Sequence, residues 1–286
     1  MTARLIHCLA PAKLNLFLHV VGRRADGYHL LQSVFQLLDA ADELDFTLRD
    51  DDRIRPLYAL PGVSEESDLV LRAARLLRQA SGMERGVDIA LRKRLPMGGG
   101  VGGGSSDAAT TLIALNHLWQ AGLSRAQLMQ LGLQLGADVP FFISGGNAFV
   151  EGIGEVITPL ETPECWFVVV EPGVHVPTPE IFRSPQLTRN TELVTIADFS
   201  RAPHGFGKND LQKVAADIFA PVAQALAALG EFGEARMTGS GSCVFCAFEN
   251  ESAADQAQQA LQVQGRWKSW KAHGINRHPM ARYLPS

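Results

Sequence analysis

The sequence predicts an α+β protein of two domains, and three observations support this class. The chain has 286 residues, of which 46% are hydrophobic and 20% charged. A chain of this composition folds by burying an apolar core, and its length suits one large domain or two modest ones. Strand-like segments come in a group before the main helices, whereas a doubly wound sheet would alternate them. Pro, Gly and Thr cluster at residues 152–163, so we expect domains over residues 1–155 and 156–286.

The first half begins with strands. Alternating apolar residues predict them, and Asp26-Gly27 marks a turn after the second. The acidic run at residues 50–52 is expected to be a solvated loop, and residues 69–77 have the spacing of an amphipathic helix. The expected strands cover residues 5–10, 13–21, 44–48 and 87–91.

Two further helices follow in the first half. Apolar residues at helical spacing predict a helix at residues 105–119, with Gly122 as its carboxy-terminal stop. Another is expected to start at Ser124, where Gln127 completes a capping box, and to end near Gly136.

The second half repeats the mixture of strands and helices, without an internal repeat. Strands are expected at residues 166–170, 235–238 and 243–248, and helices at residues 211–228 and 253–261.

Charge and cysteine content exclude several classes of function. The 26 Lys and Arg against 30 Asp and Glu give a net charge of -4, so no global positive field attracts nucleic acid or an anionic membrane. The four cysteines are too scattered for a disulfide scaffold and indicate reduced, buried thiols. We expect a cytoplasmic protein, a monomer or weak homodimer, with small-molecule substrates and neither nucleic-acid nor membrane partners.

The most informative segment is Pro96-Met97-Gly98-Gly99-Gly100-Val101-Gly102-Gly103-Gly104-Ser105-Ser106-Asp107. So many glycines are costly in entropy, and are tolerated where the backbone needs unusual dihedrals or a ligand comes very close. Because the loop leads into a helix that Ser105 or Ser106 would cap, its free N–H groups and the helix dipole would meet at one point. This arrangement predicts a phosphate site rather than a flexible linker.

Residue chemistry separates the architectures that use such a loop. A P-loop requires Gly-Lys-Ser/Thr at its end, and Gly104 is followed by Ser105 without a lysine. A dinucleotide fingerprint matches formally at Gly98, Gly100 and Gly103, but no acidic residue stands about 20 residues further on to bind a ribose.

The loop resembles the phosphate loop of the GHMP family of small-molecule kinases, in which a proline and spaced glycines precede Ser-Ser and a helix. Three further segments resemble motifs of this family in the same order: Pro11-Ala12-Lys13-Leu14-Asn15, Gly136-Ala137-Asp138-Val139-Pro140-Phe141-Phe142 and Thr238-Gly239-Ser240-Gly241-Ser242. The resemblance implies a two-domain GHMP-kinase-like fold, with the active site in the cleft between domains. It also implies ATP as the phosphoryl donor and an alcohol as the acceptor.

The resemblance also implies which residues act. Asp138 would be the base, and Lys13 would keep that carboxylate ionised and screen the alkoxide that forms. Mg²⁺ is expected with ATP, but its protein ligands stay unassigned, with Asp107 and Glu151 conceivable only through water. The expected ATP-binding residues are Pro96, Met97, Gly98, Gly99, Gly100, Val101, Gly102, Gly103, Gly104, Ser105 and Ser106.

Within the family, Asp26-Gly27-Tyr28-His29 and Pro177-Thr178-Pro179-Glu180-Ile181-Phe182 resemble the members that phosphorylate a cytidine diphosphate derivative in the non-mevalonate isoprenoid pathway. By this resemblance Tyr28 and Phe182 sandwich the cytosine, and His29 meets its hydrogen-bonding edge. Asn15 and Lys93 would hold polar and anionic parts of the same substrate.

The residues alone leave alternatives open. Asp138 might only cap a helix, Lys13 might be a surface lysine, and His29 might be a solvated turn residue. A kinase for another alcohol, such as homoserine or mevalonate, and a nucleotide-binding regulatory protein without catalysis are the rival functions. One position departs from the family pattern, because Asp68 stands where Asn is usual, which leaves the adenine contact there open.

Overall fold

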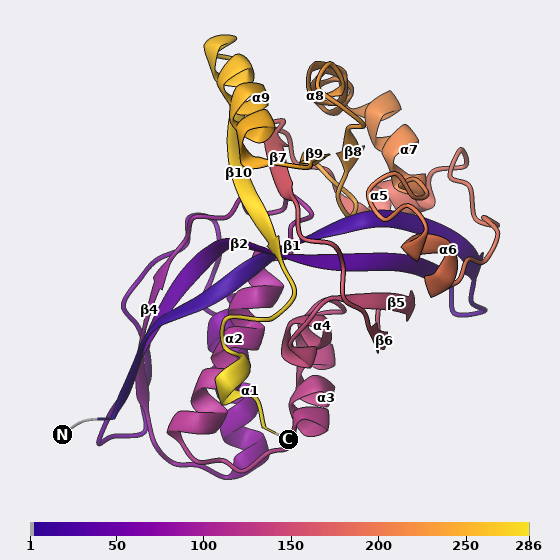
Figure 1. Ribbon diagram of the computed structural model, residues 1–286. Helices are drawn as coiled ribbons and strands as arrows, with labels where there is room; N and C mark the ends of the chain where they lie inside the picture. The colour runs from indigo at the N-terminus through magenta and orange to yellow at the C-terminus, as the bar shows by residue number, and fades with distance from the viewer. Residues whose placement is uncertain (1–2, 286) are drawn as a thin grey trace.

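The computed structural model describes residues 3–285 and has the α+β architecture that the sequence predicts (Figure 1). Its strands are β1 (Arg4–Arg23), β2 (His29–Leu48), β3 (Ile54–Pro56), β4 (Val87–Arg92), β5 (Ala148–Gly152), β6 (Val156–Pro159), β7 (Trp166–Glu171), β8 (Arg236–Met237), β9 (Val244–Phe248) and β10 (Lys268–Ile275). Its α-helices are α1 (Leu69–Ser81), α2 (Gly103–Leu118), α3 (Arg125–Leu135), α4 (Val139–Ser144), α5 (Thr178–Arg183), α6 (Ile196–Ser200), α7 (Asp210–Ile218), α8 (Ala220–Gly230) and α9 (Glu251–Val263).

The described strands join in a 10-stranded sheet. Its main path runs β3-β4-β2-β10-β7-β9-β8, while β1 and the hairpin of β5 and β6 also pair along β2. Figure 1 shows β1 and β2 as a long hairpin, with α1 to α4 on one side and α7 to α9 on the other.

The two strands predicted at residues 5–10 and 13–21 form the single strand β1. Pro11 lacks the N–H that a regular ladder needs, and the pairing with β2 shifts register between Pro11 and Lys13. The strand therefore continues through a bulge. The predicted turn is confirmed, with Gly27 at φ +92° joining β1 to β2. The strand expected at residues 44–48 is only the end of β2.

Helices α1 to α4 pack on the first half of the sheet. Their core is apolar, and Leu37, Phe46, Leu71, Leu112 and Phe141 are buried in it. Burying such side chains stabilises the fold by about 1.5 to 3 kcal/mol each, before chain entropy is counted. The predicted helix at residues 69–77 is confirmed as α1, and the predicted capping box at the start of α3 is present.

Helix α2 differs from its prediction at both ends. It begins at Gly103, with Gly102 as the N-cap at φ +75°, so Ser105 and Ser106 lie inside the first turn and do not cap it. At its other end Trp119 is the C-cap, and Gly122 lies beyond the end of the helix. The left-handed conformation at residue 102 favours glycine, so the helix starts directly after Gly102, two residues earlier than the predicted start at residue 105.

In the second half, the single helix predicted at residues 211–228 is two helices. They meet at Phe219 with an angle of 119° between them, because Pro221 cannot continue a helix from the preceding turn. No single helix within residues 3–285 is long and apolar enough to cross a membrane, and only this bent pair reaches such a length. The helix predicted at residues 253–261 is confirmed as α9.

Strand β10, which the sequence analysis did not predict, connects the two halves of the sheet. It pairs with β2 at Ile275 and with β7 along Lys268 to His273. The predicted domain boundary at 155/156 falls beside β6, which pairs with β5 across the turn. The division into residues 1–155 and 156–286 stays a prediction.

Candidate active site

The glycine loop brings free backbone N–H groups to one place between β4 and α2. Gly98, Gly100 and Gly102 all have positive φ angles. At Gly100 a Cβ atom would lie 2.2 Å from the carbonyl oxygen of Thr238, so this position requires glycine for space as well as for conformation. The first N–H groups of α2 have no acceptor within the helix and lie at the positive end of its dipole. The loop is therefore suited to an anionic group.

A second glycine turn, residues 238–242, holds this loop from the other half of the chain. The N–H of Cys243 donates to the carbonyl of Gly99 (3.1 Å), and the hydroxyl of Thr238 donates to the carbonyl of Gly100 (3.2 Å). Strand β1 joins them, because the N–H of Lys13 donates to the carbonyl of Val101 (2.9 Å). Three of the predicted motifs thus meet.

The structure brings Lys13 and Asp138 together although they are 125 positions apart. Their Nζ and Oδ2 atoms are 3.4 Å apart, and the Lys13 side chain is 3% exposed whereas that of Asp138 is 32% exposed. Lys13 is thus not a surface lysine. Nζ of Lys13 also donates to Oδ1 of Asn15 (2.5 Å) and lies over the ring of Phe35. Asp138 is the residue before α4, yet its carboxylate makes no capping hydrogen bond. The partly exposed carboxylate beside the buried ammonium leaves room for a reactant.

The Lys13 and Asp138 pair lines a cavity of about 330 Å³, together with Asn15, Ser105 and Gly239. A larger cavity, of about 750 Å³, is contiguous with it, since both are lined by Leu31, Ala137, Ile153, Thr178 and Phe182. A substrate that binds in the larger cavity can therefore extend into the smaller one and place its other end beside the ion pair.

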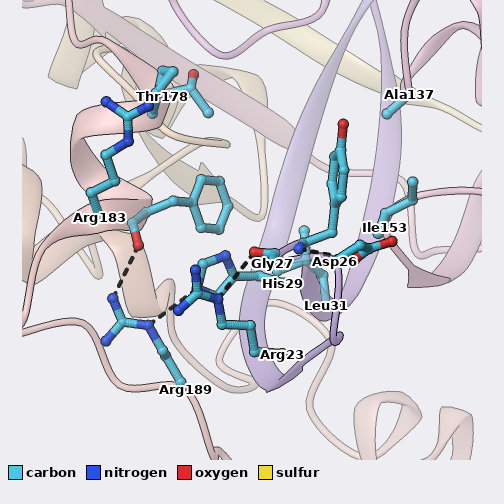
Figure 2. A pocket seen from close by; sticks show the side chains of 13 residues that line it. Arg23, Asp26, Gly27, His29, Leu31, Ala137, Ile153, Thr178, Arg183 and Arg189 are labelled. Atoms are coloured by element: carbon cyan, nitrogen blue, oxygen red, sulfur yellow. Dashed lines mark hydrogen bonds between the residues drawn. The ribbon is translucent and has the colours of Figure 1, made fainter.

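The larger cavity holds the predicted aromatic residues, and Figure 2 shows His29 among the side chains that line it. Tyr28 and Phe182 both line it, and Tyr28 is 61% exposed. The ring of His29 stacks on that of Phe182, with 4.9 Å between centroids and 28° between planes. Arg189, which was not predicted, donates from Nε to Nε2 of His29 (3.1 Å). Partial burial and the nearby guanidinium groups of Arg189 and Arg23 lower the pKa of His29.

Lys93 does not join the other predicted substrate-binding residues. Its ammonium group forms ion pairs with Asp42 and with Asp107 (2.7 Å to Oδ2). It lines a smaller cavity, of about 200 Å³, together with Asp68 and Met97 on the other side of the glycine loop. Asp68 there caps α1 through the N–H of Val70.

The buried group beneath the glycine loop has two carboxylates and one ammonium. Burial, which outweighs the attraction of Lys93, raises the pKa of Asp107 to about 7, and the like charge of Asp42 acts in the same direction. The two carboxylates conversely raise the pKa of Lys93 although burial opposes them. Oδ1 of Asp107 has no hydrogen-bond partner within the described residues.

Two residues of the site were missed by the sequence analysis. Asp42 is fully buried in β2, but Asp39, Glu43 and Asp45 stand close to it in the sequence, so its charge alone did not single it out. Arg189 lies in a segment of the chain without a motif, and nothing nearby in the sequence marks it.

Comparison with known families gives two matches. Residues 68–146 match the GHMP kinases N terminal domain, and residues 189–266 match the GHMP kinases C terminal domain. They cover the glycine loop, Asp138 and the second glycine turn.

Individual proteins match over almost the whole chain. A 4-diphosphocytidyl-2-C-methyl-D-erythritol kinase of Janthinobacterium sp. (strain Marseille) is 64% identical, covering 98% of each chain, and one of Herminiimonas arsenicoxydans is 62% identical, covering 98% of this chain and 99% of the relative. A crystal structure of 4-(cytidine 5'-diphospho)-2C-methyl-D-erythritol kinase is 34% identical with a TM-score of 0.81, covering 95% and 99%. A mevalonate kinase of L. major has the same fold at 15% identity and a TM-score of 0.66, covering 96% and 99%.

Proposed function

Since the chain belongs to the GHMP kinase family, and within it to the 4-diphosphocytidyl-2-C-methyl-D-erythritol kinases, we propose that it phosphorylates that cytidine derivative with ATP. The acceptor is the 2-hydroxyl, the products are the 2-phosphate and ADP, and the reaction belongs to the non-mevalonate route to isoprenoid precursors. The observation that carries the proposal is the ion pair of Lys13 and Asp138, which lies where the aromatic cavity and the glycine loop meet.

In this proposal Asp138 accepts the proton of the acceptor hydroxyl. Its carboxylate is partly exposed to the cavity and is not used in helix capping, so a lone pair is available to the substrate. Lys13 is buried beside it and is held by Asn15. Its ammonium group would stabilise the negative charge that develops on the acceptor oxygen.

The triphosphate is bound by the glycine loop and the first turn of α2. We assign Pro96, Met97, Gly98, Gly99, Gly100, Val101, Gly102, Gly103, Gly104, Ser105 and Ser106 to this role. Backbone N–H groups supply most of the contacts, because Lys93 is already paired with two carboxylates. Mg²⁺ would accompany ATP and would neutralise part of the charge of the triphosphate, with no residue of this chain assigned as its ligand.

The cytidine occupies the larger cavity. Tyr28 and Phe182 line it and offer faces on which a base can stack. His29 supplies a hydrogen-bonding group beside Phe182, and Asn15 lies at the passage to Lys13 and Asp138. Lys93 is better placed for the nucleotide side of the loop, since it lines the cavity with Asp68 and Met97.

We also propose that the enzyme works in the cytoplasm as a monomer or weak homodimer, without nucleic-acid or membrane partners. The four cysteines are free and buried, as expected in a reducing compartment. Burial raises the pKa of Cys165 and of Cys243 to about 12, so these thiols are unreactive.

A phosphorylation assay with a panel of alcohols tests the function. The purified chain is given ATP, Mg²⁺ and, in turn, the cytidine derivative, its uridine analogue, homoserine and mevalonate. We expect transfer to the cytidine derivative with the highest kcat/KM. Preferred transfer to homoserine or mevalonate would replace the proposal with another member of the family. ATP binding without transfer to any acceptor would favour a regulatory protein.

A further inference from the structure

We propose that Asn209 is a positioning residue for phosphoryl transfer. Its side chain holds the second glycine turn, residues 238–242, against the glycine loop and against the segment of Lys13. The inference rests on the kinase function proposed above, because that function gives the loop and Lys13 their part in the reaction. Asn209 is 5% exposed, and it acts through the turn rather than by contact with a reactant.

The amide of Asn209 joins α7 to the second glycine turn. Its Oδ1 accepts from the N–H of Leu211 (2.9 Å) and so caps α7. Its Nδ2 donates to the carbonyls of Met237 (2.7 Å) and Gly239 (2.8 Å). These partners assign the orientation of the amide, because only its nitrogen can donate to two carbonyls and only its oxygen can accept from an N–H. Both hydrogens of the amide are thus used to hold the turn.

The turn contains two flexible residues, which gives this support a purpose. Gly239 and Gly241 have φ angles of +57° and +92°, and glycine backbone has many alternative conformations to leave such angles for. Within the turn, the N–H of Gly241 donates to the carbonyl of Thr238 (3.0 Å). The carbonyls that Asn209 holds belong to the residues on either side of Thr238. Asn209 therefore fixes the place of Thr238.

Thr238 passes this restraint on to the groups of the site. Its hydroxyl donates to the carbonyl of Gly100 (3.2 Å) and accepts from the N–H of Asn15 (3.1 Å). Asn15 in turn accepts from Nζ of Lys13 (2.5 Å). A displacement of the turn would thus reach the glycine loop and Lys13 together, whereas the larger cavity is lined by other segments. Because transfer depends on alignment, a shift of about 1 Å can cost on the order of 100-fold in rate.

The variant Asn209→Asp separates positioning from helix capping. It keeps an oxygen for the N–H of Leu211, and aspartate is as good an N-cap as asparagine, but it replaces the donating NH₂ with an oxygen that repels two carbonyls. Asn209→Ala loses both the cap and the donors. We expect kcat to fall by about 10- to 100-fold in both variants, and Asn209→Asp to be no better than Asn209→Ala. If Asn209 only capped α7, Asn209→Asp would behave like the unmodified enzyme, and the inference would be overturned.

The Michaelis constants give a second readout. In Asn209→Asp, KM for ATP should rise by about 3- to 10-fold, the worth of one hydrogen bond, while KM for the cytidine derivative should change little. An equal rise in both constants would indicate a general loss of structure and would contradict positioning. Asn250 supplies the matched control, because it is exposed and caps α9 through the N–H of Ala253 (3.0 Å). Asn250→Asp should leave kcat and both KM values unchanged.

Amide hydrogen exchange tests the contact without a catalytic readout. The N–H of Cys243 donates to the carbonyl of Gly99 (3.1 Å) and reports on the junction of turn and loop. In the ligand-free enzyme its exchange should be faster in Asn209→Asp and unchanged in Asn250→Asp. The amide of Val168, in β7, should exchange at the same rate in all three proteins. An unchanged rate at Cys243 in Asn209→Asp would overturn the inference.

Failure of the proposed function and failure of this inference give different results. If the unmodified enzyme transfers no phosphate to the cytidine derivative, the proposed function is wrong. The exchange of Cys243 and the calorimetric affinity for ATP with Mg²⁺ then decide the role of Asn209. In an active enzyme, an unchanged kcat in a folded Asn209→Asp refutes positioning alone. Should Asn209→Asp not fold, Asn209→Ala decides by the same kinetic and exchange measurements.

Discussion

Replacing Asp107 with Asn should stabilise the protein by an amount that grows as the pH rises from about 4 to about 7. Asp107 is 2% exposed, and its pKa is raised from 3.8 to about 7, chiefly by burial. Between these values the folded protein holds a proton that the unfolded chain has lost. Rising pH therefore removes the contribution of Asp107 to the stability of the wild type across this window, and that loss is complete above pH 7.

The raised pKa sets the order of magnitude of the effect. A rise from 3.8 to about 7, at about 1.36 kcal/mol for each pKa unit, corresponds to on the order of 4 kcal/mol. The attraction of Lys93 is already contained in that pKa, because Lys93 is among its causes. Asn has nearly the shape of Asp and keeps an oxygen to accept from Lys93, but it carries no charge to desolvate. At pH 4 the two proteins should thus be similar in stability.

Denaturant unfolding at several pH values between 4 and 8 measures the difference. The free energy of unfolding of Asp107→Asn should rise relative to wild type through this range, with equal m-values showing that the unfolded states are comparable. Asp217→Asn is the matched control, since that side chain is 43% exposed and lies away from the site on α7. If wild type and Asp107→Asn gave parallel curves, Asp107 would not be a buried acid with a raised pKa.

The remaining predictions concern turnover and binding. Asp138→Asn should fold and bind ATP but lower kcat by about 10² to 10⁴, the usual worth of a general base, and near-normal kcat in a steady-state assay would contradict its role. Lys13→Met should also impair transfer, with Lys13→Arg a partial rescue because a guanidinium fork is not a compact point charge. Gly102→Val should raise the ATP KM sharply, since φ is +75° there and a Cβ would lie 2.9 Å from Phe142; unchanged affinity by calorimetry would remove the loop from ATP binding. Phe182→Ala should raise KM for cytidine and uridine substrates by similar factors, whereas His29→Ala should cost the cytidine substrate more, and an unchanged kcat/KM ratio would exclude His29 from base recognition.

Elements with local signals were predicted well. The capping box of Ser124 and Gln127, the turn at Gly27 and the periodic apolar residues of α1 are each encoded within a few residues. Strand β10 was missed because its pairing with β2 and β7 depends on segments more than 90 residues away. The break between α7 and α8 had a local signal in Pro221, which the apolar periodicity outweighed in the prediction.

Prediction of the site was limited in the same way, because the site also depends on contacts between distant segments of the chain. Sequence motifs placed Lys13, Asp138 and the glycine loop in one active site only through the family resemblance, since spacing alone cannot bring together residues 125 positions apart. Arg189 had no signal at all, because its role depends on which carbonyls and which ring its five donors meet. The sequence analysis assigned Lys93 to the substrate. Its ion pairs with Asp42 and Asp107 could not be predicted, because only the fold brings these residues together.

The glycine loop that we propose for phosphate binding has no lysine of its own, and these ion pairs explain how it would work without one. Asp42 accepts hydrogen bonds from the N–H groups of Arg94 and Leu95, just before the loop, and from Lys93. Lys93 in turn pairs with Asp107, just after the loop in α2. The two ends of the loop are thereby tied to each other and to β2. Because the ammonium group is shared between two carboxylates, it has little charge left for a ligand. In the proposed function, the charge of the triphosphate would then be met by backbone N–H groups and the helix dipole, an arrangement that six glycines in seven positions make possible.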